Sequence, residues 1–296
     1  NNETMTMPTI PLTALRPENP VAVMAAYGAL RLLPGAELRW ARTHPELRWD
    51  GEIIPALAQR LPERAAAPEV TLLDDPRDKN IGGVAGFRRL AEQIPHEWLG
   101  AYCSETERGI ASTDLLLLSG GHRFVRAARE IMAALARTPV AQRIEEALIG
   151  PWAYQDEAQA WGWDAAVRPN PAALPMPTAN AHKPGVLGAY WLAWESLPLW
   201  MMVGAHTVGM RREHGAWTWT YPTAAEWLSW HGLRALVLGV ERLPDRERRA
   251  LGVRTWAAPV MPTSQFGREF GMARTPSKAQ TPVGSRLTQA PDSLII

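Results

Sequence analysis

The pattern of apolar and polar positions is clearest between Thr113 and Arg137. The run Leu115–Leu118 is continuously apolar, which is typical of a strand buried on both faces. Ser119-Gly120-Gly121 interrupts this run. Apolar residues then recur at helical spacing, which predicts a helix from about His122. Its expected buried stripe is Phe124, Ala128, Ile131 and Leu135, and its water-facing side chains are Arg123, Arg126 and Glu130.

A second clear helix begins at Asn19-Pro20, because Asn can cap a first turn and Pro fits within it. Pro34-Gly35 ends this helix. Its expected apolar face comprises Val23, Ala26, Tyr27, Leu30 and Leu33. Further helices are predicted over Ile53–Arg64, Val84–Trp98, Val140–Ile149, Val186–Glu195, Thr223–Ser229 and Asp245–Leu251.

Shorter segments carry strand patterns. The tryptophans of Ala216–Tyr221 alternate with polar residues, and with Thr207–Glu213 this segment predicts a hairpin that turns at His214-Gly215. Other strands are predicted over Thr9–Leu15, Glu37–Thr43, Glu46–Asp50, Val70–Leu73 and Leu233–Val240. The mixture of elements predicts an α+β fold class, with helices packed on a mixed sheet and long proline-rich connections.

Three regions are expected along the chain. Residues 1–165 form an N-terminal α/β domain, and residues 166–262 form a second α/β region that contains the Trp-rich hairpin. Residues 263–296 form a flexible basic tail. Prolines are dense in the connection between the two α/β regions, at 169, 171, 175, 177 and 184.

Composition narrows the function classes. The 296 residues are 46% hydrophobic and 21% charged, as expected of a globular protein without a membrane span. The formal net charge of +1 excludes strong global attraction to nucleic acid, so any such binding needs a local patch. Cys103 is the one cysteine, which excludes an internal disulfide and a thiolate zinc cluster. With no secretory signal pattern, the expected location is the reducing cytoplasm.

The sequence carries no recognisable catalytic motif. The seven histidines lack zinc-binding spacing, and Ser119-Gly120-Gly121 is not a nucleophile elbow. Asp74, Asp75 and Asp78 could hold a hard cation, but a solvated acidic turn is the better interpretation of their spacing. We therefore expect a protein that is not an enzyme and that needs no metal or other cofactor.

Candidate binding residues are instead cationic or glycine-rich. Around Gly120 and Gly121, the predicted strand, turn and helix start could together bind an anion, because backbone amides and the helix dipole favour negative charge there. The two glycines are also explained by a tight turn between strand and helix. Trp217 and Trp219 suit base stacking if exposed and core packing if not. Each of the predicted nucleic-acid-binding residues could also be part of a solvated face of the protein. These residues are Lys79, Asn80, Arg88, Arg89, Gly120, Gly121, His122, Arg123, Arg126, Arg211 and Arg212.

Several short blocks resemble subunits of type I-G (formerly I-U) CRISPR systems. The segment Asn19–Arg31 is similar to the opening helix of those proteins, which begins Asn-Pro and continues through small residues to Gly-x-Leu-Arg. The other similar blocks are Ser119–His122, Gly150-Pro151-Trp152, Gly162-Trp163-Asp164 and Gly188–Pro198. The blocks do not distinguish between two families of these systems. One is the large subunit of the RNA-guided complex, and the other is an accessory extension of the helicase-nuclease.

The resemblance implies a subunit that works with CRISPR RNA, target DNA and other Cas proteins, including the helicase-nuclease. The leading hypothesis is a non-catalytic subunit of a Cascade-like interference complex that contacts nucleic-acid backbone and neighbouring subunits. A protein-only adaptor that recruits the helicase-nuclease is the alternative. A metal-dependent hydrolase that uses Asp74 or Asp75 is the least favoured interpretation.

Overall fold

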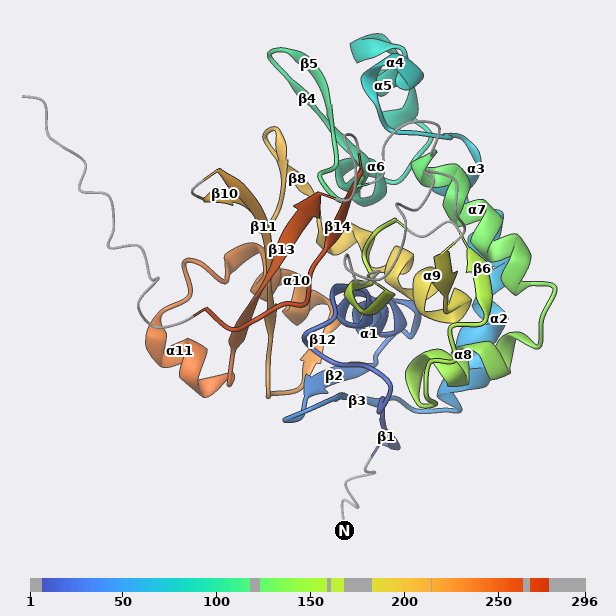
Figure 1. Ribbon diagram of the computed structural model, residues 1–296, viewed down its shortest axis with the longest axis vertical. Helices are drawn as coiled ribbons and strands as arrows, with labels where there is room; N and C mark the ends of the chain where they lie inside the picture. The colour runs from blue at the N-terminus through green and yellow to red at the C-terminus, as the bar shows by residue number, and fades with distance from the viewer. Residues whose placement is uncertain are drawn as a thin grey trace, which may run out of the picture.

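Helix α1 (Pro20–Leu32) lies at the centre of the molecule (Figure 1). The computed structural model describes residues 7–117, 123–158, 161–167, 183–213, 215–262 and 267–276. Every residue of α1 except Arg31 is buried, so the helix is enclosed on all sides. Its main neighbour is α9 (Leu187–Glu195), which is also buried along its whole length. These two apolar helices, one from each predicted α/β region, form the centre of the core.

The remaining helices surround this pair. Helices α2 (Ile53–Ala65), α7 (Phe124–Leu135) and α8 (Val140–Leu148) cover one side of it (Figure 1). The shorter helices are α3 (Pro68–Thr71), α4 (Asp78–Ile81), α5 (Gly83–Ala91), α6 (His96–Tyr102), α10 (Trp230–Gly239) and α11 (Asp245–Ala250). Two 3-10 turns span Ala165–Val167 and Leu197–Leu199.

The strands form several small sheets, and every described strand pair is antiparallel. One four-stranded sheet has the order β1 (Thr9–Pro11), β3 (Pro45–Arg48), β2 (Glu37–Trp40) and β12 (Leu228–Ser229). The other has the order β10 (Met210–Glu213), β11 (Ala216–Thr223), β13 (Arg254–Pro262) and β14 (Arg268–Phe270). Two-stranded ribbons pair β4 (Cys103–Thr106) with β5 (Gly109–Ser112), β6 (Asp156–Ala158) with β7 (Lys183–Gly185), and β8 (Met202–Val203) with β9 (His206–Thr207).

The α+β fold class is confirmed, but several element assignments are wrong. The expected strand over Leu233–Val240 is helix α10, in which Leu233, Leu236 and Val237 are buried at helical spacing. The Ser229 hydroxyl caps this helix by accepting a hydrogen bond from the Gly232 amide at 3.2 Å. The expected helix over Thr223–Ser229 instead contains the end of β11 and strand β12.

Three other predictions fail because proline or a turn interrupts the pattern. Val70 and Thr71 are helical rather than extended, since Pro68 begins α3, and Leu72 and Leu73 follow the helix without forming a strand. The helix expected over Val84–Trp98 is divided into α5 and α6, with Pro95 immediately before α6. Leu115–Leu117 form an irregular turn, not a strand, and residues 118–122 lie outside the described part of the chain.

Most of the tryptophans are buried in the core. Trp161 stacks on both Trp163 and Trp194, with ring centroids 4.5 and 5.2 Å apart, and Phe124 packs beside this group. A second group is built around Trp219 of the hairpin, which is fully buried. The core interpretation of Trp219 is therefore confirmed, whereas Trp217 is half-buried and packs against the ring of His206.

The buried core includes residues from both sides of position 165. Residues 268–270 of the expected tail form β14, and residues 277–296 are outside the described part. The division into domains stays a prediction. Of the helices described, none has both the length and the apolar composition that crossing a membrane requires.

Candidate anion-binding site

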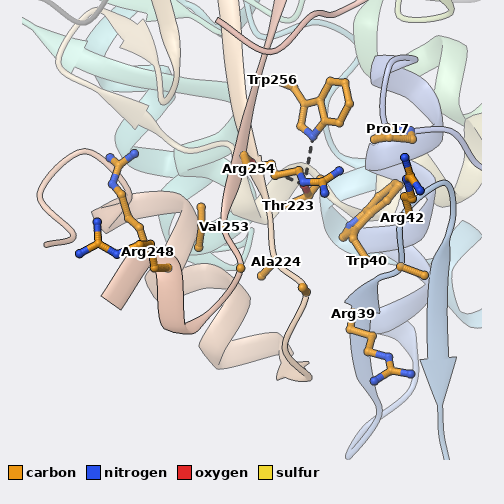
Figure 2. A pocket seen from close by; sticks show the side chains of 14 residues that line it. Pro17, Arg39, Trp40, Arg42, Thr223, Ala224, Arg248, Val253, Arg254 and Trp256 are labelled. Atoms are coloured by element: carbon orange, nitrogen blue, oxygen red, sulfur yellow. Dashed lines mark hydrogen bonds between the residues drawn. The ribbon is translucent and has the colours of Figure 1, made fainter. Parts of the chain in front are cut away.

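A cavity of about 670 Å³ opens between the end of β2 and the segment that joins α11 to β13 (Figure 2). We call it the arginine cavity. The end of β11 lies between these two walls. The lining residues are Pro17, Arg39, Trp40, Ala41, Arg42, Thr223, Ala224, Ala225, Arg248, Arg249, Gly252, Val253, Arg254 and Trp256.

Backbone hydrogen bonds hold the walls of the arginine cavity together. The Trp40 amide donates to the Ala224 carbonyl at 2.7 Å, which joins the end of β2 to the end of β11. The Ala225 amide donates to the Leu251 carbonyl at 3.0 Å, which joins the end of β11 to the turn after α11. Beneath the opening, the Trp256 indole N–H donates to the Thr223 hydroxyl at 3.0 Å. The site is thus built on fixed backbone from three distant parts of the sequence.

The charge of the cavity differs sharply from that of the whole chain. Five of its 14 lining residues are arginines, and none of the 14 is an Asp or a Glu. The chain as a whole has a formal net charge of only +1. Arginine side chains around one hollow create a local positive potential, to which those without an acidic partner contribute most, and this potential attracts anions.

The five arginines fall into two groups according to their hydrogen bonds. Arg39 forms an ion pair with Glu46 and lies over the Trp227 ring at 4.6 Å. Arg248 donates to the carbonyl oxygens of Val240 and Leu243, and so ties α11 to the end of α10. Arg42, Arg249 and Arg254 are exposed, and among the described residues their guanidiniums have no hydrogen-bond or ion-pair partner. These three are free to bind an external anion.

The two indoles that line the cavity are not stacking platforms. Trp40 is 6% exposed and Trp256 is 8% exposed, so their rings lie beneath the surface. They supply apolar surface beside the arginines, Trp40 next to Arg42 and Trp256 above Arg254 in this view (Figure 2). The chemistry that the cavity offers is therefore charge-assisted hydrogen bonding to phosphate, sulfate or carboxylate groups.

The predicted binding residues lie elsewhere, in two regions. Lys79 and Asn80 are exposed on α4, and the Arg123 guanidinium donates to the Asn80 side-chain oxygen at 2.6 Å, which brings these three predicted residues together. Arg88 and Arg89 are exposed on the adjacent α5, where Arg88 forms an ion pair with Glu105 at 3.1 Å.

The other predicted residues are engaged within the protein or lie outside the described part. Arg126 forms an ion pair with Glu130 at 2.9 Å, and Arg211 forms one with Glu241. Arg212 donates to the Gly215 carbonyl at 3.5 Å. Gly120, Gly121 and His122 are outside the described residues. Their roles in binding stay predictions.

Asp75, a candidate metal ligand, organises the loop between α3 and α4 and joins it to the start of α7. Its buried carboxylate accepts hydrogen bonds from the Arg77 guanidinium at 2.7 and 2.8 Å, from the Asn80 amide at 3.0 Å and from the Phe124 backbone at 3.3 Å. Burial acts to raise the pKa of Asp75, but the hydrogen bonds from Arg77 outweigh it and hold that pKa below its ordinary value. The carboxylate is fully occupied as a structural acceptor.

Replacing Asp75 by Asn is expected to lower the free energy of unfolding at pH 7 by about 1–3 kcal/mol, because a buried charged acceptor is lost. Since the pKa of Asp75 is lowered on folding, its stabilisation is present above the ordinary carboxyl pKa and is lost as the pH falls through the folded-state pKa. The difference between wild type and variant should therefore shrink on acidification. Urea denaturation at pH 7 and at about pH 2 measures it, because only the lower pH lies well below the ordinary carboxyl pKa, and an equal difference at both values would contradict this assignment.

Sequence reasoning missed the arginine cavity. Its arginines come from residues 39–42 and 248–254, which are about two hundred positions apart and form no local motif. The charged run Asp245–Leu251 is the one available signal, and its pattern predicts only a short helix. No group of three or more metal-ligating side chains occurs among the residues that the structure describes. Comparison with family models and with curated proteins finds no match to this chain.

Proposed function

We propose that this chain is a non-catalytic, cytoplasmic subunit of a CRISPR RNA-guided interference complex. In this proposal it contacts nucleic-acid backbone through the arginine cavity and neighbouring Cas subunits through other surfaces. The observation that carries the proposal is the set of free guanidiniums of Arg42, Arg249 and Arg254 in a cavity without carboxylates. Backbone contacts of this kind position a nucleic acid without specifying its sequence, which guide pairing supplies in such complexes.

The partners in this proposal are CRISPR RNA, target DNA and other Cas subunits, including the helicase-nuclease. The resemblance of Asn19–Arg31 and the later blocks to type I-G subunits supports these identities. The arginine cavity supports the more general part of the proposal, which is that the chain binds a polyanion.

The test is to purify the chain with its genomic neighbours and to extract any bound RNA. The double charge reversal Arg42→Glu/Arg254→Glu is expected to reduce retained nucleic acid at least tenfold at about 0.1 M salt, because attraction becomes repulsion at two phosphate contacts. Arg60→Glu/Arg137→Glu is the matched control, since it makes the same charge change on α2 and after α7 and should leave retention unchanged. The double variant Arg123→Glu/Arg126→Glu, measured in the same assay, tests the binding surface that the sequence predicts.

A protein-only adaptor is the second candidate, and one observation favours it. Val203 and Leu238 are 65% and 48% exposed, and both line a second cavity between β9 and α10. Exposed apolar side chains at a hollow are typical of protein contact sites. Association with the helicase-nuclease that survives nuclease treatment and high salt, with no bound RNA, would favour this candidate over the first.

A further inference from the structure

We infer that the arginine cavity holds a single-stranded segment of nucleic acid through its phosphates alone, between Arg42 on one wall and Arg249 and Arg254 on the other. This inference rests on the proposed function and adds to it the form of the nucleic acid and the residues that bind it. Charge complementarity identifies the occupant, because the free cations line both walls of a hollow with no acidic lining residue.

The positions of the arginines suit a strand that passes between two walls. Arg42 extends from the end of β2, whereas Arg249 is at the end of α11 and Arg254 is the first residue of β13. In Figure 2, Arg254 lies between Arg42 on the β2 side and Arg248 on the α11 side. Cations on both sides of a passage can contact successive phosphates of one backbone, as in other single-strand grooves.

The hollow shape favours a single strand over a duplex. A duplex is a stiff rod with a persistence length of about 50 nm, and it presents its phosphates on a convex surface. A cavity of about 670 Å³ with arginines on its walls cannot admit such a rod, so a duplex could touch only the rim. A flexible single strand can enter and place phosphates between the walls.

The lining also lacks the side chains that read adenine and cytosine edges. It contains no Asn, Gln, Asp or Glu, the residues that pair with adenine and cytosine edges. Its two indoles are buried and cannot stack on bases. Affinity for strands of adenine or thymine should therefore come from phosphate contacts and differ little between the two, because arginine reads guanine edges and not these bases.

Arg248 has a different role from the three free arginines. Its guanidinium is hydrogen-bonded to the carbonyl oxygens of Val240 and Leu243, so it fixes α11 against the end of α10 and thereby places Arg249 at the cavity wall. Arg248 is a positioning residue for the site, and Arg42, Arg249 and Arg254 are the phosphate ligands.

The experiment measures binding of the full chain to fluorescent 12-nucleotide strands by anisotropy, between 50 and 300 mM salt. For Arg42→Gln/Arg249→Gln/Arg254→Gln, the slope of log affinity against log salt should be smaller in magnitude by about 2, because each single-strand phosphate contact contributes about 0.7. Oligo-dA and oligo-dT should bind within about threefold of each other, and a duplex of equal length at least tenfold more weakly. The control Arg60→Gln/Arg108→Gln/Arg137→Gln removes the same charge outside the cavity and outside the predicted binding residues, and it should keep the wild-type slope.

The outcomes separate this inference from the proposed function. If the wild-type chain, alone and in its assembly, binds no nucleic acid, the proposed function fails. If it binds single strands but the triple variant keeps the wild-type slope and a wild-type melting curve, the inference is wrong and the proposed function stands. Tighter binding of the duplex, or displacement of the strand by poly-glutamate at equal charge concentration, would also overturn the inference, the latter in favour of an acidic protein segment.

Discussion

Replacing Glu195 by Ala is expected to lower the free energy of unfolding by about 3–5 kcal/mol, which is the usual effect of removing one member of a buried ion pair. The Glu195 side chain is fully buried at the end of α9. Its carboxylate accepts hydrogen bonds from Arg31 at 2.7 Å and from Arg64 at 3.0 Å. The variant would leave two largely buried guanidiniums facing a cavity.

The surroundings of Glu195 show why the loss is not easily compensated. Both guanidiniums lie over the Trp98 ring, at 4.9 and 5.2 Å from its centroid, so they cannot move to water without losing this contact. Burial acts to lower the pKa of Arg64, but the attraction of Glu195 and Glu69 outweighs it and raises that pKa above its ordinary value. The network joins α1, α2, the start of α3 and α9 by charge.

Glu63→Ala provides a matched control, because Glu63 forms an exposed ion pair with Arg60 within α2. Exposed pairs of this kind contribute at most about 1 kcal/mol, so this variant should be close to wild type. Urea denaturation followed by tryptophan fluorescence reports both variants. A Glu195→Ala protein within about 1 kcal/mol of wild type would show that the network does not stabilise the fold.

The second large effect is expected for Gly28→Ala at the crossing of α1 and α9. A Cβ at position 28 would lie 1.7 Å from the carbonyl oxygen of Leu192, which is backbone and cannot rotate away. The two central helices would have to separate, and the destabilisation should reach at least about 3 kcal/mol, the upper part of the range for overpacked cores. Thermal melting and the yield of folded protein measure it.

Gly239→Ala is the control for this substitution. Gly239 ends α10, and a Cβ there would have no atom within 4 Å. Because alanine favours helix over glycine, this variant should be as stable as wild type or more stable by up to about 1 kcal/mol. If Gly28→Ala melted at the same temperature as Gly239→Ala, the close approach of α1 and α9 would not be a requirement of the fold.

Arginines thus serve two different purposes in this protein. Arg31 and Arg64 are buried and hold the centre of the fold together through Glu195. Arg42, Arg249 and Arg254 are exposed and have no partner among the described residues. A count of charged residues in the sequence does not distinguish these groups, because their difference depends on which carboxylates the fold brings near each guanidinium.

The sequence by itself determined the elements whose local signals agree with one another. Asn19-Pro20 and Pro34-Gly35 bound the central helix closely, and the apolar spacing from Phe124 to Leu135 predicted α7. The Trp-rich hairpin followed from its alternation, and α2, α8 and α9 were placed within one or two residues. These segments carry apolar patterns long enough to specify one structure, and proline or glycine marks several of their ends. The predicted cap is wrong, because the Asn19 side chain makes no capping hydrogen bond and donates instead to Asp164.

Only the tertiary structure decided the rest. The apolar run Leu233–Val240 is compatible with a buried strand or a buried helix. The cap from Ser229, together with packing beside α1, makes it a helix. The arginine cavity exists because β2 is hydrogen-bonded to the end of β11, which brings residues near 40 next to residues near 250. The physical reason is that a positive patch depends on distances between side chains, and sequence order fixes those distances only within a single element.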